Sequence, residues 1–207
     1  MTITGTPVST TLRGCCTVDQ VKTRLGITTD ETDTLLEGVI AGVTAAFESW
    51  CQRRLVRLAA DVAEYHRGGA TELYLKAFPA VVITSVHEAL LHDYDDALAA
   101  DEDYVLNDRR GILVRVLGTW LAGADAVRVI YSGGYTPAGL AVGEGEIAMP
   151  GEIVEAAIQQ AAFVFSRRAE LGLSAVTAAD GSINAAVIDT LLPGVQQMIS
   201  GHRRISL

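Results

Sequence analysis

Two histidines, His87 and His92, lie in the short segment His87-Glu88-Ala89-Leu90-Leu91-His92, and imidazoles are common zinc ligands. A zinc-protease signature needs its two histidines four residues apart, because one face of a helix must present both rings to the metal. Here they are five residues apart, and the segment is typical of a strand and a turn. We therefore interpret both as ordinary side chains and expect no metal site.

An acidic run between positions 93 and 103 has the ligand type that calcium prefers. A standard calcium loop carries a glycine in its middle and a glutamate at its end, and this run has neither. We interpret it as a solvated acidic turn, and the segment 180–184 as an ordinary Asp-Gly turn. The residues of the run are Asp93, Asp95, Asp96, Asp101, Glu102 and Asp103.

The segment Ser132-Gly133-Gly134-Tyr135 is rich in glycine, but a phosphate loop also needs Gly-Lys-Ser/Thr and a following helix. The sequence contains neither a Gly-x-Ser-x-Gly nucleophile elbow nor a Cys-x-x-Cys pair. We therefore expect no catalytic residues and no cofactor. Because distant acids and bases can still assemble into an active site, a small cytosolic enzyme or ligand-binding domain stays open as an alternative.

The composition indicates an ordinary globular protein: of 207 residues, 49% are hydrophobic and 20% charged. The net charge of -9 disfavours a protein that grips phosphates, but suits one that DNA passes without sticking. Three cysteines, two of them adjacent, predict free thiols. We expect neither a membrane span nor a secretory signal, and synthesis in the cytoplasm.

Helix signals lie at both ends of the sequence. A capping box at 17–20 predicts a short helix that stops at Gly26, and a second start at 28–31 predicts a long amphipathic helix to Arg53-Arg54. Pro150 begins a third helix that ends at Arg167-Arg168. After a flexible connection at 171–182, we expect helices at 183–192 and 194–200, separated by Pro193. The predicted buried face of the long helix is Leu35, Leu36, Val39, Ile40, Val43, Phe47 and Trp50.

The middle of the chain favours strands, at 62–66, 73–75, 81–90, 104–106, 112–116 and 127–131. Gly68-Gly69 predicts a turn that joins the first two strands as a hairpin. A surface loop follows at 133–151. We therefore predict an α+β protein, mainly α, with a helical bundle and a β-rich insertion between its second and third long helices. The expected divisions are a flexible leader at 1–16, a bundle at 17–58 and 150–200, the insertion at 59–135, a loop at 136–149 and a C-terminal tail at 201–207.

The order of these elements resembles that of the phage head-tail connector family, also called head completion or neck adaptor proteins. Four segments, spread over about residues 17–200, carry the resemblance. They are residues 17–27 with the following helix and Arg53-Arg54-Leu55; Leu73-Tyr74-Leu75 to Pro79 with residues 81–86; Val127-Arg128-Val129-Ile130-Tyr131-Ser132-Gly133-Gly134-Tyr135; and Met149-Pro150 with the helix to Arg168.

The resemblance implies a structural, non-enzymatic adaptor of a tailed phage or phage-like particle. Such a protein forms a head-to-tail ring of about twelve subunits, a dodecamer, under the portal. Its expected partners are its own copies, the portal, the next neck or tail protein, and DNA that passes without sequence recognition during ejection. It would be made in the host cytoplasm and reside at the head-tail junction of the virion, without membrane contact. The alternative within the same class is another neck or tail-completion subunit.

The resemblance also suggests that the C-terminal tail reaches the portal. Arginines that pair with acids, beside apolar anchors, suit this role, and a frayed terminus is the alternative. The loop is the second candidate, for subunit or tail contacts, against the alternative of a passive surface loop. The portal candidates are His202, Arg203, Arg204, Ile205 and Leu207, and the loop candidates are Tyr135, Pro137, Leu140, Glu144 and Glu146.

Overall fold

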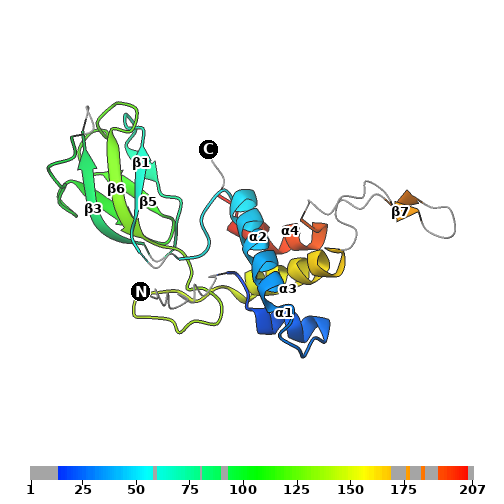
Figure 1. The fold of residues 1–207 in the computed structure, drawn as a ribbon. Helices are drawn as coiled ribbons and strands as arrows, with labels where there is room; N and C mark the ends of the chain where they lie inside the picture. The colour runs from blue at the N-terminus through cyan, green and yellow to red at the C-terminus, as the bar shows by residue number, and fades with distance from the viewer. Residues whose placement is uncertain are drawn as a thin grey trace, which may run out of the picture.

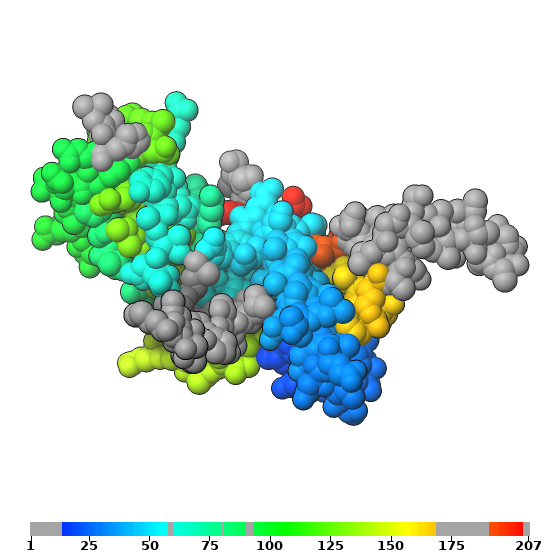
Figure 2. All heavy atoms as spheres, viewed as in Figure 1, coloured from blue at the N-terminus to red at the C-terminus, as the bar shows by residue number. Residues whose placement is uncertain are grey.

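The computed structural model describes residues 14–57, 60–79, 81–89, 93–168, 176–177, 183–184 and 191–204. Two lobes make up the molecule (Figures 1 and 2). Four helices form one lobe: α1 (Val18–Leu25), α2 (Asp33–Cys51), α3 (Gly151–Ser166) and α4 (Pro193–Ile199). Strands β1 to β6, which lie between α2 and α3 in the sequence, form the other. The predicted α+β class is confirmed.

The capping box at the start of α1 is confirmed. The Gln20 N–H donates to Thr17 Oγ1 over 3.3 Å, and the Thr17 N–H donates to the Gln20 side chain over 2.9 Å. Helix α2 begins at Asp33, slightly later than predicted. Lys22 Nζ lies 2.7 Å from an Asp30 carboxylate oxygen and 2.8 Å from one of Asp33, so both the connection and the first residue of α2 are bound to α1.

The apolar face of α2 packs against α3, and α4 packs beside them, in one hydrophobic core (Figure 1). Leu36, Ile40, Val43 and Phe47 are buried there, as predicted. Leu35 is 48% exposed, so the prediction of its burial is wrong. The apolar face of α2 is wider than the surface that α3 and α4 cover.

The strands form two three-stranded antiparallel sheets around a second core. One sheet has the order β1-β6-β3, and the other has the order β2-β5-β4. Trp120 is fully buried in this core, and its indole N–H donates to the Thr71 carbonyl over 3.0 Å. The strands are β1 (Val62–His66), β2 (Glu72–Tyr74), β3 (Val82–Glu88), β4 (Tyr104–Asn107), β5 (Ile112–Arg115) and β6 (Val127–Ser132).

The predicted hairpin between the first two strands is wrong, although both strands exist. β1 pairs with β6 and β2 pairs with β5, so the two strands belong to different sheets. The N–H groups of Gly68 and Gly69 donate to the Gly123 and Trp120 carbonyls, over 3.1 and 2.9 Å. The glycine pair therefore lets the chain cross from one sheet to the other while it lies against another backbone segment. Glycine allows this close approach because it has no side chain.

The prediction of a helix at 183–192 is wrong at its first residues. Ile183–Asn184 form β8, which pairs with β7 (Val176–Thr177), and β-branched side chains favour such a ladder. Residues 185–190, the leader up to residue 13 and most of the predicted connection at 171–182 lie outside the described residues. Helix α4 is close to its prediction, with Pro193 in its first turn.

All three cysteines, Cys15, Cys16 and Cys51, are free and buried in the helical core, so the prediction of free thiols is confirmed. Burial raises the pKa of the Cys15 and Cys16 thiols to about 12, and that of Cys51 to about 11.

We predict that Gly68→Ala lowers the free energy of unfolding by about 1–3 kcal/mol, as expected for forced overpacking. A Cβ at this position would lie 1.8 Å from the Leu121 carbonyl oxygen, so backbone must move. Urea denaturation measures the change. Gly38→Ala is the matched control, because its Cβ meets nothing within 4 Å and alanine favours a helix, so it should raise stability by about 0.5–1 kcal/mol. Equal effects of the two substitutions would contradict the close approach.

We also predict that the folded protein resists thiol reagents. The raised pKa values leave very little thiolate at pH 8, and burial keeps the reagent away. Labelling at pH 8 with mass detection should find almost no modified cysteine in the folded protein and three in denaturant. Rapid labelling of any thiol in the folded state would show that the helical core is open.

Candidate interaction surfaces

The histidine and acidic segments form ordinary structure. His87 lies in β3, with ring Nδ1 3.1 Å from the Asp96 carbonyl oxygen, whereas His92 lies outside the described residues. The Asp103 carboxylate accepts from the Ala99 N–H and pairs with Arg115, and these contacts lower its pKa. No group of three or more potential metal ligands occurs among the described residues. Within the same part of the chain, no helix has the length and apolar character for crossing a membrane.

Arg204 joins the tail to both lobes. Its backbone N–H donates to the Cys51 carbonyl at the end of α2, over 2.9 Å. Its guanidinium donates to the carbonyls of Leu75 and Arg110 in the β lobe. The same group lies 4.9 Å from the centroid of the Phe78 ring, and desolvation lowers its pKa. Arg204 therefore holds the tail at the junction of the two lobes.

Arg53, which lies just after the end of α2, contributes to the same junction. It is 7% exposed, and its guanidinium lies 3.6 Å from the Phe78 ring centroid and 5.4 Å from that of Tyr135. It also donates to the Phe78 carbonyl, and burial lowers its pKa. The sequence pattern marked Arg53 only as a helix end, so its structural role was missed. We call Arg53, Phe78, Tyr135 and Arg204 the junction cluster.

The other tail candidates have different surroundings. His202 contacts the Glu152 carboxylate at the start of α3, and its ring lies 6.2 Å from that of Tyr135. Arg203 is exposed, with its guanidinium 5.4 Å from the Trp50 ring centroid. Ile205 and Leu207 lie outside the described residues. The structure thus brings His202 next to Tyr135, the first of the loop candidates, and Arg204 next to Phe78.

The loop between β6 and α3 is anchored at its base and exposed at its tip. Tyr135 and Pro137 are buried, so the prediction of a surface loop holds only for the part beyond them. The Glu146 carboxylate accepts from Thr136 Oγ1 over 2.9 Å and from the Gly143 N–H over 3.0 Å. It also pairs with Arg57 at 3.5 Å, and a backbone bridge joins Thr136 to Ala148. Glu146 therefore shapes the loop that presents the exposed residues Leu140, Val142, Glu144 and Ile147.

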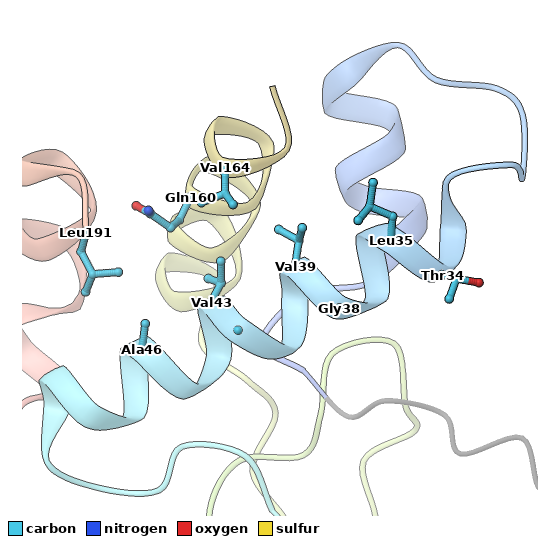
Figure 3. Close-up of a pocket in the computed structure, with 10 residues that line it drawn as sticks. Thr34, Leu35, Gly38, Val39, Val43, Ala46, Gln160, Val164 and Leu191 are labelled. Atoms are coloured by element: carbon cyan, nitrogen blue, oxygen red, sulfur yellow. The ribbon is translucent and has the colours of Figure 1, made fainter. Parts of the chain in front are cut away.

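An open groove with a volume of about 420 Å³ runs along α2 and is closed on one side by α3 and by Leu191, two residues before α4 (Figure 3). None of the described residues that line it is charged. Sequence reasoning assigned part of this surface to the core, because periodicity shows which face of a helix is apolar but not whether that face is covered. We call it the α2 groove; its lining is Thr34, Leu35, Gly38, Val39, Gly42, Val43, Ala46, Gln160, Val164 and Leu191.

The first half of the chain is similar to a known protein family. Residues 16–108 match the family of phage gp6-like head-tail connector proteins. These residues make up less than half of the chain, and over them the chain is similar to that family. The family resemblance inferred from the sequence is thereby confirmed, and with it the role of a structural head-tail adaptor located at the head-tail junction of a virion.

Solved structures extend the likeness in fold to nearly the whole chain. A chain in the neck of an empty gene transfer agent particle, computed with C6 symmetry, is 16% identical, with a TM-score of 0.62 and coverage of 98% of this chain and 95% of that one. A chain in the neck of the native particle, computed with C12 symmetry, has a TM-score of 0.56 at 16% identity, covering 86% of each chain. A chain in the virion of the native particle has a TM-score of 0.57 at 16% identity, covering 91% and 89%. At this identity the likeness shows the fold, and no curated protein sequence matches the connector chain.

We predict that the two adjacent arginines of the tail differ in their effect on stability. Arg204→Ala should lower the free energy of unfolding by about 1.5–3 kcal/mol, because charged hydrogen bonds to two carbonyls are lost. Arg203→Ala removes one exposed ring contact and should cost less than about 1 kcal/mol. Urea denaturation of both variants checks this, and an equal, small effect would contradict the anchoring of the tail.

Proposed function

We propose that this connector chain forms a closed ring of about twelve subunits directly under the portal, where it continues the DNA channel and receives the next neck or tail protein. The match of residues 16–108 to the head-tail connector family carries the proposal. The fold shared with a neck chain in a particle computed with C12 symmetry supports the ring number.

In this proposal the protein is not an enzyme and works through the complementarity of its surfaces. Apolar anchors and paired charges at subunit edges would hold the ring, as in other protein interfaces. The net charge of -9 fits a channel wall that DNA passes without adhering, because like charges repel.

The tail is the part proposed to meet the portal, through His202, Arg203, Arg204, Ile205 and Leu207. Its position supports this: His202 and Arg204 fix the start of the tail to the junction cluster, from which the last residues can extend to a partner. Apolar side chains at the very end, beside arginines, suit an anchor in a partner pocket.

The loop between β6 and α3 is proposed as the contact with a neighbouring subunit or with the tail. Leu140 and Glu144 are exposed and available for such a contact. Tyr135, Pro137 and Glu146 contribute by holding the loop in shape, because the first two are buried and the third is hydrogen-bonded within the loop.

The finer description of the fold belongs to the same proposal. We regard the chain as a mainly α protein, with a bundle at 17–58 and 150–200 that holds the ring and a β-rich insertion at 59–135. The leader at 1–16, the loop at 136–149 and the tail at 201–207 would be its contact segments. The element order, with β1 to β6 between α2 and α3, supports this division.

We predict that mass measurement over a wide concentration range finds rings of about twelve chains, or a monomer that joins the portal ring in fixed stoichiometry. Removal of Ile205–Leu207, which leaves Arg204 in place, should weaken portal binding at least tenfold, about 1.4 kcal/mol. Leu117→Ser is the control, since this 83% exposed side chain belongs to neither proposed contact. A chain that stays monomeric or dimeric at all concentrations and ignores the portal would overturn the proposed function.

A further inference from the structure

We propose that the α2 groove of one subunit receives the connection between α3 and α4, residues 169–190, of a neighbouring copy of this chain. The inference rests on the ring proposed above and names one contact that would hold it together.

The groove is a site for an apolar partner segment. Gly38 and Gly42 leave room along α2, since a Cβ at either position would meet nothing within 4 Å. Leu35 is half-exposed at one end, and Val164 and Leu191 form the opposite wall (Figure 3). Binding in an apolar concavity without charged lining is most favourable for a segment that has apolar or small side chains and few charges.

The connection between α3 and α4 has this chemistry. It is 22 residues long, and only Glu170, Asp180 and Asp189 carry a charge. Small residues are frequent in it, so it can lie close to a helix surface that lacks side chains at two positions. Its larger apolar residues are Leu171, Leu173, Val176, Ile183, Val187 and Ile188.

The arrangement of the chain favours a neighbour's groove over its own. Val164 and Leu191, which flank the connection in the sequence, both line the groove, so a subunit carries the groove next to the two points where the connection begins and ends. The described part of the connection is the antiparallel pair β7 and β8, in which Val176 pairs with Asn184, and we call the connection that carries this pair the arm. Figure 1 shows this strand pair standing away from α2, beyond the ends of α3 and α4. An arm on one subunit and a groove on the next make a head-to-tail contact, the type that closes into a ring.

Disulfide trapping between two full-length chains tests this contact. One chain carries Gly42→Cys in the groove, and the other, with a different tag, carries Ala179→Cys in the arm. The two are mixed under the conditions in which the unmodified chain forms rings, alone or on the portal, and treated with oxidised glutathione. The native cysteines are buried, so the introduced pair should give the dominant product. A disulfide forms only if the Cα atoms approach within about 7 Å.

We expect a disulfide between differently tagged chains, and none when the groove cysteine is replaced by Ala45→Cys, which is exposed on α2 outside the groove lining. As a second measurement, Gly42→Leu fills the groove and should raise the concentration needed for rings at least tenfold, whereas Ala45→Leu should not.

The other outcomes separate this contact from the ring itself. A link confined to single chains that carry both cysteines would mean that the arm occupies its own groove, and would overturn the proposal. If rings form normally but no disulfide links the two chains, or if Gly42→Leu leaves ring formation unchanged, the proposed contact is overturned and the proposed ring is not. If the unmodified chain makes no ring with or without the portal, both proposals fail.

Discussion

Two guanidinium groups, those of Arg53 and Arg204, contact the ring of Phe78 where the helical and β cores meet. The two cores are separate hydrophobic clusters, so their relative position depends on this narrow region. No carboxylate of the described residues lies within ion-pair distance of either group, and backbone carbonyls and aromatic rings take its place. Desolvating a cation is costly, so such contacts stabilise the junction only while their geometry is kept.

Backbone hydrogen bonds complete the junction. The Arg54 N–H donates to the Lys76 carbonyl over 2.7 Å, and the Tyr135 N–H donates to the Leu55 carbonyl over 2.8 Å. Gly134, with φ of 104°, lets the loop pass close to residues 55–57, where a side chain would meet backbone atoms at 3.0 Å. The loop and the tail, which are the two proposed contact segments, therefore start from the same rigid point.

The elements that were predicted well are those encoded by neighbouring residues. The capping box at Thr17 and the proline of α4 act within one helical turn, so the sequence alone locates them. Apart from the local pairs of β4 with β5 and of β7 with β8, strand pairing depends on residues about 40 to 70 positions apart, such as Val62 with Tyr131. The glycine pair at 68–69 was misread for this reason, since a hairpin turn and a close backbone crossing have the same local pattern.

The interaction surfaces were predictable only in part. The resemblance suggested the tail as one contact segment and the sequence pattern suggested the loop as another, and both stay proposals. The contact of Arg53 with Phe78 joins residues 25 positions apart and has no sequence signal. The α2 groove was missed because Leu35 and Val39 continue the apolar stripe of the core. Coverage of a helix face is decided by where the other helices end, which is a property of the packed structure.

The docking of His202 and Arg204 on their own subunit would make the proposed binding of the tail to a partner a competition. A partner that takes these side chains must first displace Glu152, Leu75 and Arg110 from them. Its apparent dissociation constant then exceeds the intrinsic one by the inverse of the fraction of subunits with a released tail. In the proposed contact with the portal, a weak or misplaced partner would not compensate for that loss, and a docked tail would thereby filter the order in which a particle is put together.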